Sequence, residues 1–386
     1  MTQARRIGPF ELAECLGEGS GTRLYRAIRP HGSRPPYEVC IRIATNPLDP
    51  VVAAAIRAEY QTLRAMDNPR IPRAYGHYPD ESALAMSYYA GASLSDAIQA
   101  RDDGLVTITI SSALDFAIEI AHGFRHAHSM TGPANRKIVH GHLGPQRIRI
   151  TPAGDLVLVG FGCVPRGRHP AYTAPEVANG SPASPRSDQW TLGSMLVEMI
   201  VGERLYAAAA NVDEAVREGD VAYWVQQAAE QHPELGDPLR TMLAADPAQR
   251  FAENHQLLKA LLTAGRKIGG TVNRRSFATA VMAHSNRLSK VRPERASLNS
   301  ASLASPQAHG PASAVGRRAH TDPPSRPDPL LPEHPWAQPL MQPLPAPSST
   351  PPAPPLAPRY LPSEVAGTVL GGIMMVLGAV YVFMVL

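Results

Sequence analysis

Cysteine is scarce in this 386-residue sequence, which has three residues of that type (Cys15, Cys40 and Cys163) and no CxxC pair. Such a small, odd number of thiols excludes a disulfide framework and argues against a cysteine zinc site. The first residues, MTQARR, also lack the apolar run of a secretory signal. We therefore expect the folded part of the chain to lie in a reducing, cytoplasmic setting.

Residues 1–265 lack an excess of basic side chains. They carry 25 Lys and Arg against 28 Asp and Glu, whereas residues 266–386 carry 12 against 5. Folded domains that bind nucleic acids usually concentrate positive charge on one surface. We therefore expect no nucleic acid partner, and we assign the positive charge of the chain to its tail.

Residues 298–362 lack regular apolar spacing, and 18 prolines fall between Pro306 and Pro362. A segment of this composition cannot bury enough apolar surface to offset the entropy of ordering it. It predicts a disordered linker with local polyproline II character.

Residues 365–386 lack charge altogether over 22 residues. A helix of that length spans about 33 Å at about 1.5 Å per residue, which is enough to cross a bilayer core. Arg359 lies just before this segment, so we expect a single-pass membrane helix with its N-terminal side in the cytoplasm. Gly367 and Gly371 form a GxxxG spacing, which predicts a possible homodimer contact.

Residues 266–297 carry eight basic side chains and one acidic side chain, Glu294. Two interpretations of this basic juxta-domain segment stay open. It is a solvated linker, or it is attracted to anionic lipid headgroups, which stabilise each nearby positive charge by about 1 kcal/mol.

Residues 1–265 begin with strand patterns and continue mainly with helical patterns. Period-two runs predict strands over Pro9–Leu16, Arg23–Ile28, Tyr37–Ile43 and Ala83–Tyr88. Helical spacing predicts helices over Val52–Met66, Ala113–His128 and Trp190–Val201. A strand-rich start followed by a helix-rich remainder predicts an α+β fold with two lobes.

Seven short motifs follow one another along residues 16–250. They are LGEGSGTRLYRA at 16–27, VCIR at 39–42, VHGHLGPQR at 139–147, GFG at 160–162, APE at 174–176, SDQWTLG at 187–193 and DPAQR at 246–250. In this order they resemble the glycine-rich loop, third strand, catalytic loop, DFG, APE, central-helix and late-arginine motifs of the bacterial Ser/Thr protein kinase-like family. The resemblance covers about residues 8–262 and implies a bilobal protein kinase-like fold.

At several motif positions, the sequence keeps the residues that stabilise the fold in the family. The resemblance implies a buried ion pair between Glu176 and Arg250, and it implies that Asp188 holds the catalytic-loop backbone. It places Glu59 where the family has an ion-pair glutamate in the small lobe. His140 and Phe161 fall, with Leu63, on the family's hydrophobic spine between the lobes.

At other motif positions, the sequence differs from the residues that the family uses for phosphoryl transfer. The family's lysine falls on Arg42, its acceptor-orienting aspartate on His142, and the neighbouring lysine on Gly144. The two magnesium ligands fall on Arg147 and Gly160, neither of which offers an oxygen side chain. The resemblance thus implies a pseudokinase with no catalytic residue. We expect magnesium to be unsuited to the site and leave ATP binding open as doubtful.

The altered cleft is predicted to be rich in arginine. Arg147 and Arg149 lie two apart in a strand-like run, so they share one face, and Arg42 joins them by resemblance. Two interpretations stay open: the arginines fill an occluded cleft and pair with Glu59, or they bind an anion, a nucleotide or an acidic peptide without metal. In the second case the glycine-loop residues Gly17, Gly19 and Gly21 join the binding site.

His140 and His142 form an HxH spacing, which is insufficient for a metal site, and we expect none. The sequence favours a membrane-tethered pseudokinase that acts as a signalling scaffold or binding module for a cytoplasmic protein partner. The alternative is a residual or atypical ATP-dependent Ser/Thr protein kinase with a non-standard nucleotide pose. A third possibility is a structural tether that dimerises through its membrane helix.

Overall fold

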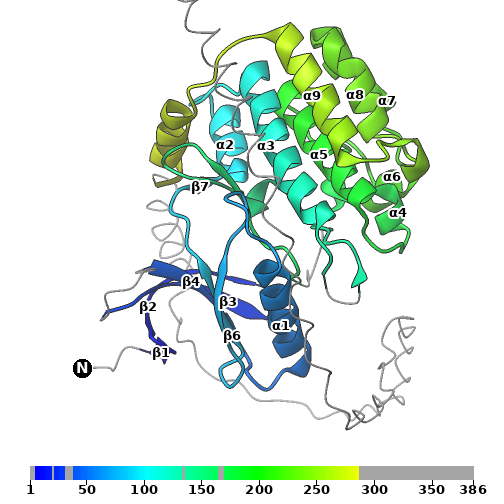
Figure 1. Ribbon diagram of the computed structural model, residues 1–386. Helices are drawn as coiled ribbons and strands as arrows, with labels where there is room; N and C mark the ends of the chain where they lie inside the picture. The colour runs from blue at the N-terminus through cyan, green and yellow to red at the C-terminus, as the bar shows by residue number, and fades with distance from the viewer. Residues whose placement is uncertain (1–4, 20, 31–37, 133–134, 164–168, 287–386) are drawn as a thin grey trace, which may run out of the picture. The chain divides into compact units, whose positions relative to one another are not determined.

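The computed structural model describes residues 5–19, 21–30, 38–132, 135–163 and 169–286, and these residues form two lobes (Figure 1). The linker expected over 298–362, the membrane helix expected over 365–386 and the contact expected at Gly367 and Gly371 lie outside the described residues. Within the described residues, no helix is long and apolar enough to cross a membrane.

The small lobe is an antiparallel sheet with one helix beside it. Its strand order is β1-β2-β3-β4-β6-β5, with β1 (Arg6–Ile7), β2 (Phe10–Gly19), β3 (Thr22–Ile28), β4 (Glu38–Ala44), β5 (Ala74–Tyr78) and β6 (Ala83–Ser87). Every second residue of β4 (Val39, Ile41 and Ile43) is buried in one core cluster. Because strand side chains alternate, Cys40 and Arg42 point to the opposite face of the sheet.

Helix α1 (Pro50–Arg64) packs along that opposite face (Figure 1). The Asp49 side chain accepts hydrogen bonds from the backbone amides of Val51 and Val52, and proline stands at the first helical position. Both features favour a helix start here. Val52, Ile56, Glu59 and Leu63 lie on its buried face, so the helix carries a carboxylate into the interior.

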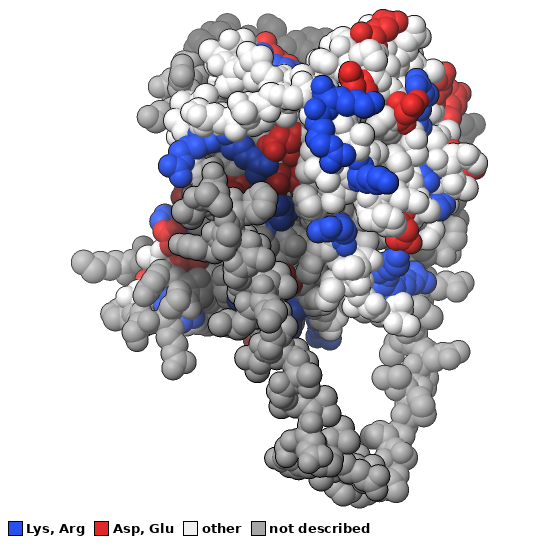
Figure 2. Space-filling model, turned by 45° about the horizontal axis from the view of Figure 1, so that its top comes forward, with Lys and Arg blue, Asp and Glu red and all other residues white. Residues whose placement is uncertain are grey.

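The large lobe is helical, and its central helix is α5 (Pro185–Val201), which is buried along most of its length. Around it lie α2 (Leu94–Asp102), α3 (Ile110–Ser129), α4 (Pro175–Ala178), α6 (Val212–Glu218), α7 (Ala222–Gln231), α8 (Gly236–Met242) and α9 (Asn254–Ile268). A small sheet, β7-β8-β9, lies at the junction of the lobes, with β7 (Ala92–Ser93), β8 (Ile148–Ile150) and β9 (Leu156–Leu158). On the face in Figure 2, basic and acidic side chains are interspersed.

The expected strands and helices are confirmed, with shifts at their ends. For example, β2 continues to Gly19, beyond the expected Leu16, and α5 begins at Pro185 rather than Trp190. Sequence patterns missed β1, β5, β7 and β9. Strands β1, β7 and β9 have two or three residues, which is too short to show a period, and the sequence of β5, AYGHY, does not alternate clearly between apolar and polar residues. The boundary expected at Gly265 falls inside α9, which runs to Ile268.

One expected strand starts too early. Arg147 is the last residue of a 3-10 helix, Pro145–Arg147, and β8 begins only at Ile148. The period-two argument that placed Arg147 and Arg149 on one face therefore fails. The Pro145 ring favours the turn, since it occupies the first position of this short helix.

Candidate functional site

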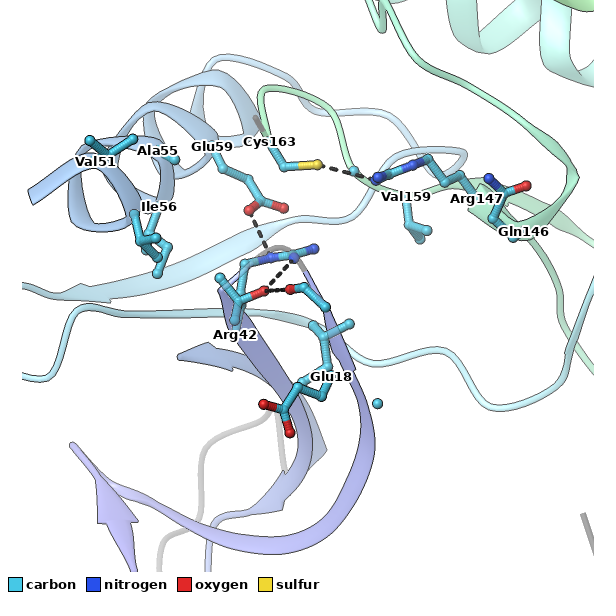
Figure 3. A pocket seen from close by; sticks show the side chains of 16 residues that line it. Glu18, Arg42, Val51, Ala55, Ile56, Glu59, Gln146, Arg147, Val159 and Cys163 are labelled. Carbon is cyan, nitrogen blue, oxygen red and sulfur yellow. Dashed lines mark hydrogen bonds and ion pairs between the residues drawn. The ribbon is translucent and has the colours of Figure 1, made fainter. Parts of the chain in front are cut away.

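The cleft between the lobes contains a buried ion pair between β4 and α1. Arg42 Nε lies 2.8 Å from Glu59 Oε2, and the Glu59 side chain is 1% exposed (Figure 3). Burial raises the pKa of Glu59 despite the opposing field of Arg42. The two partners come from elements whose inward faces were visible in the sequence pattern, and the structure brings them together.

Arg42 also reaches the glycine-rich loop. Its Nη1 donates to Thr22 Oγ1 at 3.3 Å, and that hydroxyl donates to the backbone oxygen of Gly19 at 3.0 Å. Thr22 stands where the family has its last loop glycine. A guanidinium has more donors than an ammonium and holds them in a fixed fork. The arginine and the threonine together tie α1, β4 and the glycine loop to one another.

A side chain of α5, Asp188, anchors the backbone of the loop at 139–147. Asp188 accepts hydrogen bonds from the backbone amides of His140 and Gly141, both at 2.8 Å, and lies 2.8 Å from His128 Nε2. The His140 ring lies 4.6 Å from the Phe161 ring, centroid to centroid. Burial, together with the nearby positive charge of Arg147, lowers the pKa of His140 to about 4, so this ring is neutral at pH 7.

Arg147 and Gly160 are close neighbours in the cleft. A Cβ atom built on Gly160 would overlap Arg147 Nη1, so the guanidinium already occupies the space where a side chain at position 160 would begin. Arg147 Nη1 donates to Cys163 Sγ at 3.1 Å (Figure 3). His142 Nε2 lies 3.2 Å from the same sulfur. Burial, followed by the negative charge of Glu59, raises the pKa of this thiol.

A cavity of about 400 Å³ lies between the glycine loop, α1 and Arg147. Gly17 and Gly19 line it, whereas Gly21 does not. The other lining residues are Glu18, Thr22, Leu24, Arg42, Val51, Val52, Ala55, Ile56, Glu59, Gln146, Arg147, Val159, Gly160 and Cys163.

Arg149 does not line this cavity, contrary to the sequence expectation. It lies on β8 and its Nη2 donates to the backbone oxygen of Gly91, next to β7. The three arginines therefore play different parts. Arg42 is paired with Glu59, Arg149 binds backbone, and Arg147 faces a thiol with no carboxylate in ion-pair range among the described residues.

The residues at the metal position do not fit magnesium. That ion requires several oxygen ligands in octahedral geometry. Here Gly160 offers no side chain and the Arg147 guanidinium, a cation, occupies the neighbouring space. Within the described parts of the chain, no group of three His, Cys, Asp or Glu side chains is placed to hold a metal ion.

A second ion pair lies in the large lobe, away from the cleft. Arg250 donates from Nη1 and Nη2 to the two carboxylate oxygens of Glu176, both at 2.8 Å. Its Nη1 also donates to the backbone oxygen of Arg186 at 2.9 Å, and its guanidinium lies over the Trp190 ring. The pair fastens α4 to the segment before α9.

Sequence reasoning missed part of the cavity wall. Cys163, Gln146 and the α1 residues from Val51 to Ile56 line the cavity without having been singled out. Cys163 was detectable, since it directly follows the GFG motif. The α1 wall was not, because apolar helix residues at this spacing are normally core.

The fold and the order of these elements agree with a comparison against protein families. Residues 10–262 match the protein kinase domain. The chain belongs to the protein kinase family. This match confirms the resemblance drawn from the seven motifs.

Relatives of the chain include proteins named as kinases and one named as a probable inactive kinase. It is 27% identical over 229 residues to a probable inactive receptor kinase of Arabidopsis thaliana, an alignment that covers 55% of this chain and 33% of the relative. It is 28% identical over 195 residues to a serine/threonine-protein kinase of Corynebacterium efficiens, covering 46% and 34%. The chain thus spans only about a third of the length of these curated relatives.

A solved structure supports the fold. The kinase domain of PknI from Mycobacterium tuberculosis superposes with a TM-score of 0.52 at 17% identity, covering 68% of this chain and 99% of that domain. At this identity the likeness concerns the fold. Together with the Corynebacterium relative, it supports a bacterial Ser/Thr kinase-like family.

Proposed function

We propose that this kinase-family chain is a pseudokinase, which works as a recognition module in signalling rather than as a phosphotransferase. The observation that carries the proposal is the position of Arg147. Its guanidinium fills the space beside Gly160, where the family needs a carboxylate to hold magnesium. A positive charge built into that position opposes the binding of a metal cation there.

The rest of the cleft supports the same proposal. His142 stands at the position of the acceptor-orienting aspartate and contacts Cys163. Meanwhile the bracing contacts remain, including Glu59 with Arg42 and Asp188 with the loop backbone. A fold that keeps these stabilising contacts and lacks the reactive groups suits partner binding, because binding needs only a stable surface.

An autophosphorylation assay tests the lack of catalysis. The full-length protein is incubated with labelled ATP and either magnesium or manganese, beside a heat-denatured control and an active kinase as positive control. We expect no label above the denatured control. Label that exceeds this control and persists in several preparations would overturn the proposal in favour of a residual kinase.

A second candidate function is binding of an anion without metal. It is favoured by Arg147, whose guanidinium lines the cavity and donates a hydrogen bond to the Cys163 thiol. A fork of N–H donors suits phosphate or carboxylate oxygens. Thermal-shift titrations with ATP, with and without magnesium, test it. We expect ATP to raise the melting temperature equally with and without magnesium, and we expect this increase to disappear in Arg147→Ala. If ATP leaves the melting temperature unchanged under both conditions, nucleotide binding is rejected.

We also propose that residues 365–386 tether the module to a membrane, with the kinase-like domain on the cytoplasmic side. This rests on the 22 uncharged residues of that segment. Membrane fractionation of the full chain and of a chain lacking 365–386 tests it. The full chain is expected in the membrane fraction and the shortened chain outside it. Comparing the oligomeric state of the two chains tests the homodimer expected from Gly367 and Gly371.

A further inference from the structure

The chain continues past the end of the family match at residue 262 and folds back onto the large lobe. After α9 it turns at Gly269 and Gly270 and forms a helix over 274–286, shown in dark yellow beside α2 in Figure 1. We call residues 271–286 the strap. Ala278, Val281 and His284 are buried, although the sequence analysis treated this stretch as a linker that is solvated or faces lipid.

The strap makes close contacts along its length. Ser111 Oγ donates to the backbone oxygen of Gly269 at 2.9 Å, and the Phe277 ring meets the Phe116 ring edge-on at 5.2 Å. At its far end, His284 Nε2 lies 3.1 Å from Asp103 Oδ2, just after α2. Gly154 allows the approach of the strap backbone, because a Cβ there would lie 2.6 Å from the carbonyl carbon of Arg274.

Arg274 anchors the strap to α3 through two carboxylates. Its Nε and Nη2 donate to the two oxygens of Asp115, both at 2.6 Å, and Nη2 also donates to Glu119 Oε1 at 3.2 Å. The other oxygen of Glu119 accepts from Arg70 Nε at 2.6 Å. Burial alone raises the pKa of Glu119, but the hydrogen bonds from Arg70 and Arg274 hold it below its usual value.

Arg70 joins this network to the wall of the cleft. It lies in the loop after α1, and its backbone oxygen accepts from the amide of Leu158, in β9, at 2.8 Å. The next amide, that of Val159, donates to the backbone oxygen of Arg147 at 2.9 Å. Gly160 follows directly. The side chains of Arg274, Glu119 and Arg70, followed by two backbone hydrogen bonds, therefore connect the strap to the cavity wall. The wall residues reached in this way are Arg147 and Gly160.

We infer that the strap is a conformational control element of the cleft: when docked, it holds Arg70 through Glu119 and so fixes the position of β9, Arg147 and Gly160. Glu119 is the shared partner. When Arg274 leaves, Glu119 has one cation instead of two, and the packing of Phe277 is lost with it. This coupling holds whether or not the cleft transfers phosphate.

The test compares Arg274→Ala with Arg275→Ala in the full-length protein. Arg275 is the matched control, since its exposed side chain makes no ion pair with the described residues. The first readout is amide hydrogen exchange at Leu158 and Val159. The second is alkylation of Cys163, a partly buried thiol in the cavity wall, relative to the exposed Cys15 in the same molecule. Susceptibility to proteolysis at 269–273 reports whether the strap has left α3.

We expect Arg274→Ala to speed both exchange and Cys163 alkylation about 5- to 30-fold, as a local opening does, while Arg275→Ala resembles the parent. Arg274→Lys, which keeps the charge without the two-pronged contact, is expected to fall between them. Phe277→Ala serves as a second route to release, in case Arg274→Ala loses its fold.

Two outcomes overturn the inference. In one, either variant releases the strap, as proteolysis shows, while Leu158, Val159 and Cys163 keep the parent rates. In the other, Arg274→Ala leaves both the strap and the cleft unchanged, which removes Arg274 as the anchor.

Discussion

Arg147 and Gly160 share one volume: the guanidinium of the first occupies the space in which a side chain of the second would begin. The glycine also has a backbone φ of +95°, a conformation that most side chains disfavour. The two positions are thus physically coupled, because a side chain at 160 would displace the Arg147 guanidinium from its present place. The two positions, which the sequence presents as separate replacements, are therefore neighbours in the structure.

This coupling predicts an unequal response of two glycines to alanine. Gly160→Ala meets both backbone strain and Arg147, whereas Gly180→Ala meets only strain, since Gly180 has φ +92° and open space around its Cβ position. We expect a loss of about 1 kcal/mol at position 180 and about 1 kcal/mol more at position 160, where the Arg147 guanidinium has to shift and give up its hydrogen bond to Cys163. Urea unfolding of the two variants measures the difference. Adding Arg147→Ala to Gly160→Ala is expected to recover most of that excess, and purely additive losses would contradict the coupling.

Breaking the Arg250–Glu176 pair is expected to destabilise the large lobe strongly. The Arg250 side chain is fully buried, so Glu176→Gln leaves an uncompensated buried guanidinium at a cost of about 3–5 kcal/mol. Arg240→Ala is the control, since the Arg240–Asp237 pair is exposed and surface pairs contribute about 0–1 kcal/mol. Midpoints of urea unfolding compare the two. Equal midpoints would show that the Glu176 contact is not bracing the lobe.

The replacement of the family's lysine can be tested at Arg42. Arg42→Lys keeps the charge facing Glu59 but loses the hydrogen bond to Thr22, for which we expect a loss of about 1 kcal/mol. Arg42→Ala leaves the buried Glu59 without its cation, so we expect it to lower the free energy of unfolding by about 3–5 kcal/mol. Hydrogen exchange of the glycine loop should rise in both variants. An Arg42→Lys protein as stable as the parent, with an unchanged loop, argues against the tie to Thr22.

Stability is expected to fall as the pH drops through the range set by His140. Its pKa is about 4 in the folded protein and about 6.5 when unfolded, so the unfolded chain binds a proton first. The contribution is fully present above pH 6.5 and is lost progressively down to pH 4, by about 3 kcal/mol in total.

The free energy of unfolding of the parent and of His140→Phe, measured between pH 4 and 8, checks this expectation. The difference between the two proteins isolates His140, because His77, His122 and His169 also have lowered pKa values and remain in both. The variant is expected to show a shallower loss of stability between pH 6.5 and 4. Parallel curves would exclude a buried neutral His140.

The sequence by itself determined the family and the two-lobed α+β fold. Motif order and spacing are local properties of the chain, and the alternation in β4 and the helical spacing in α1 predicted which residues face inward. The pairing of Arg42 with Glu59 was one of two interpretations that the family resemblance left open, and the structure shows the pair.

Only the tertiary structure decided which arginines line the cleft and where the chain after α9 goes. A 3-10 turn at Pro145–Arg147 changes the direction of the Arg147 side chain, and the path of Arg149 depends on Gly91, 58 residues away. The docking of Arg274 depends on Asp115 and Glu119, more than 150 positions earlier in the chain. Contacts between residues so distant in sequence leave no local period, so their partners become visible only when the fold brings them together.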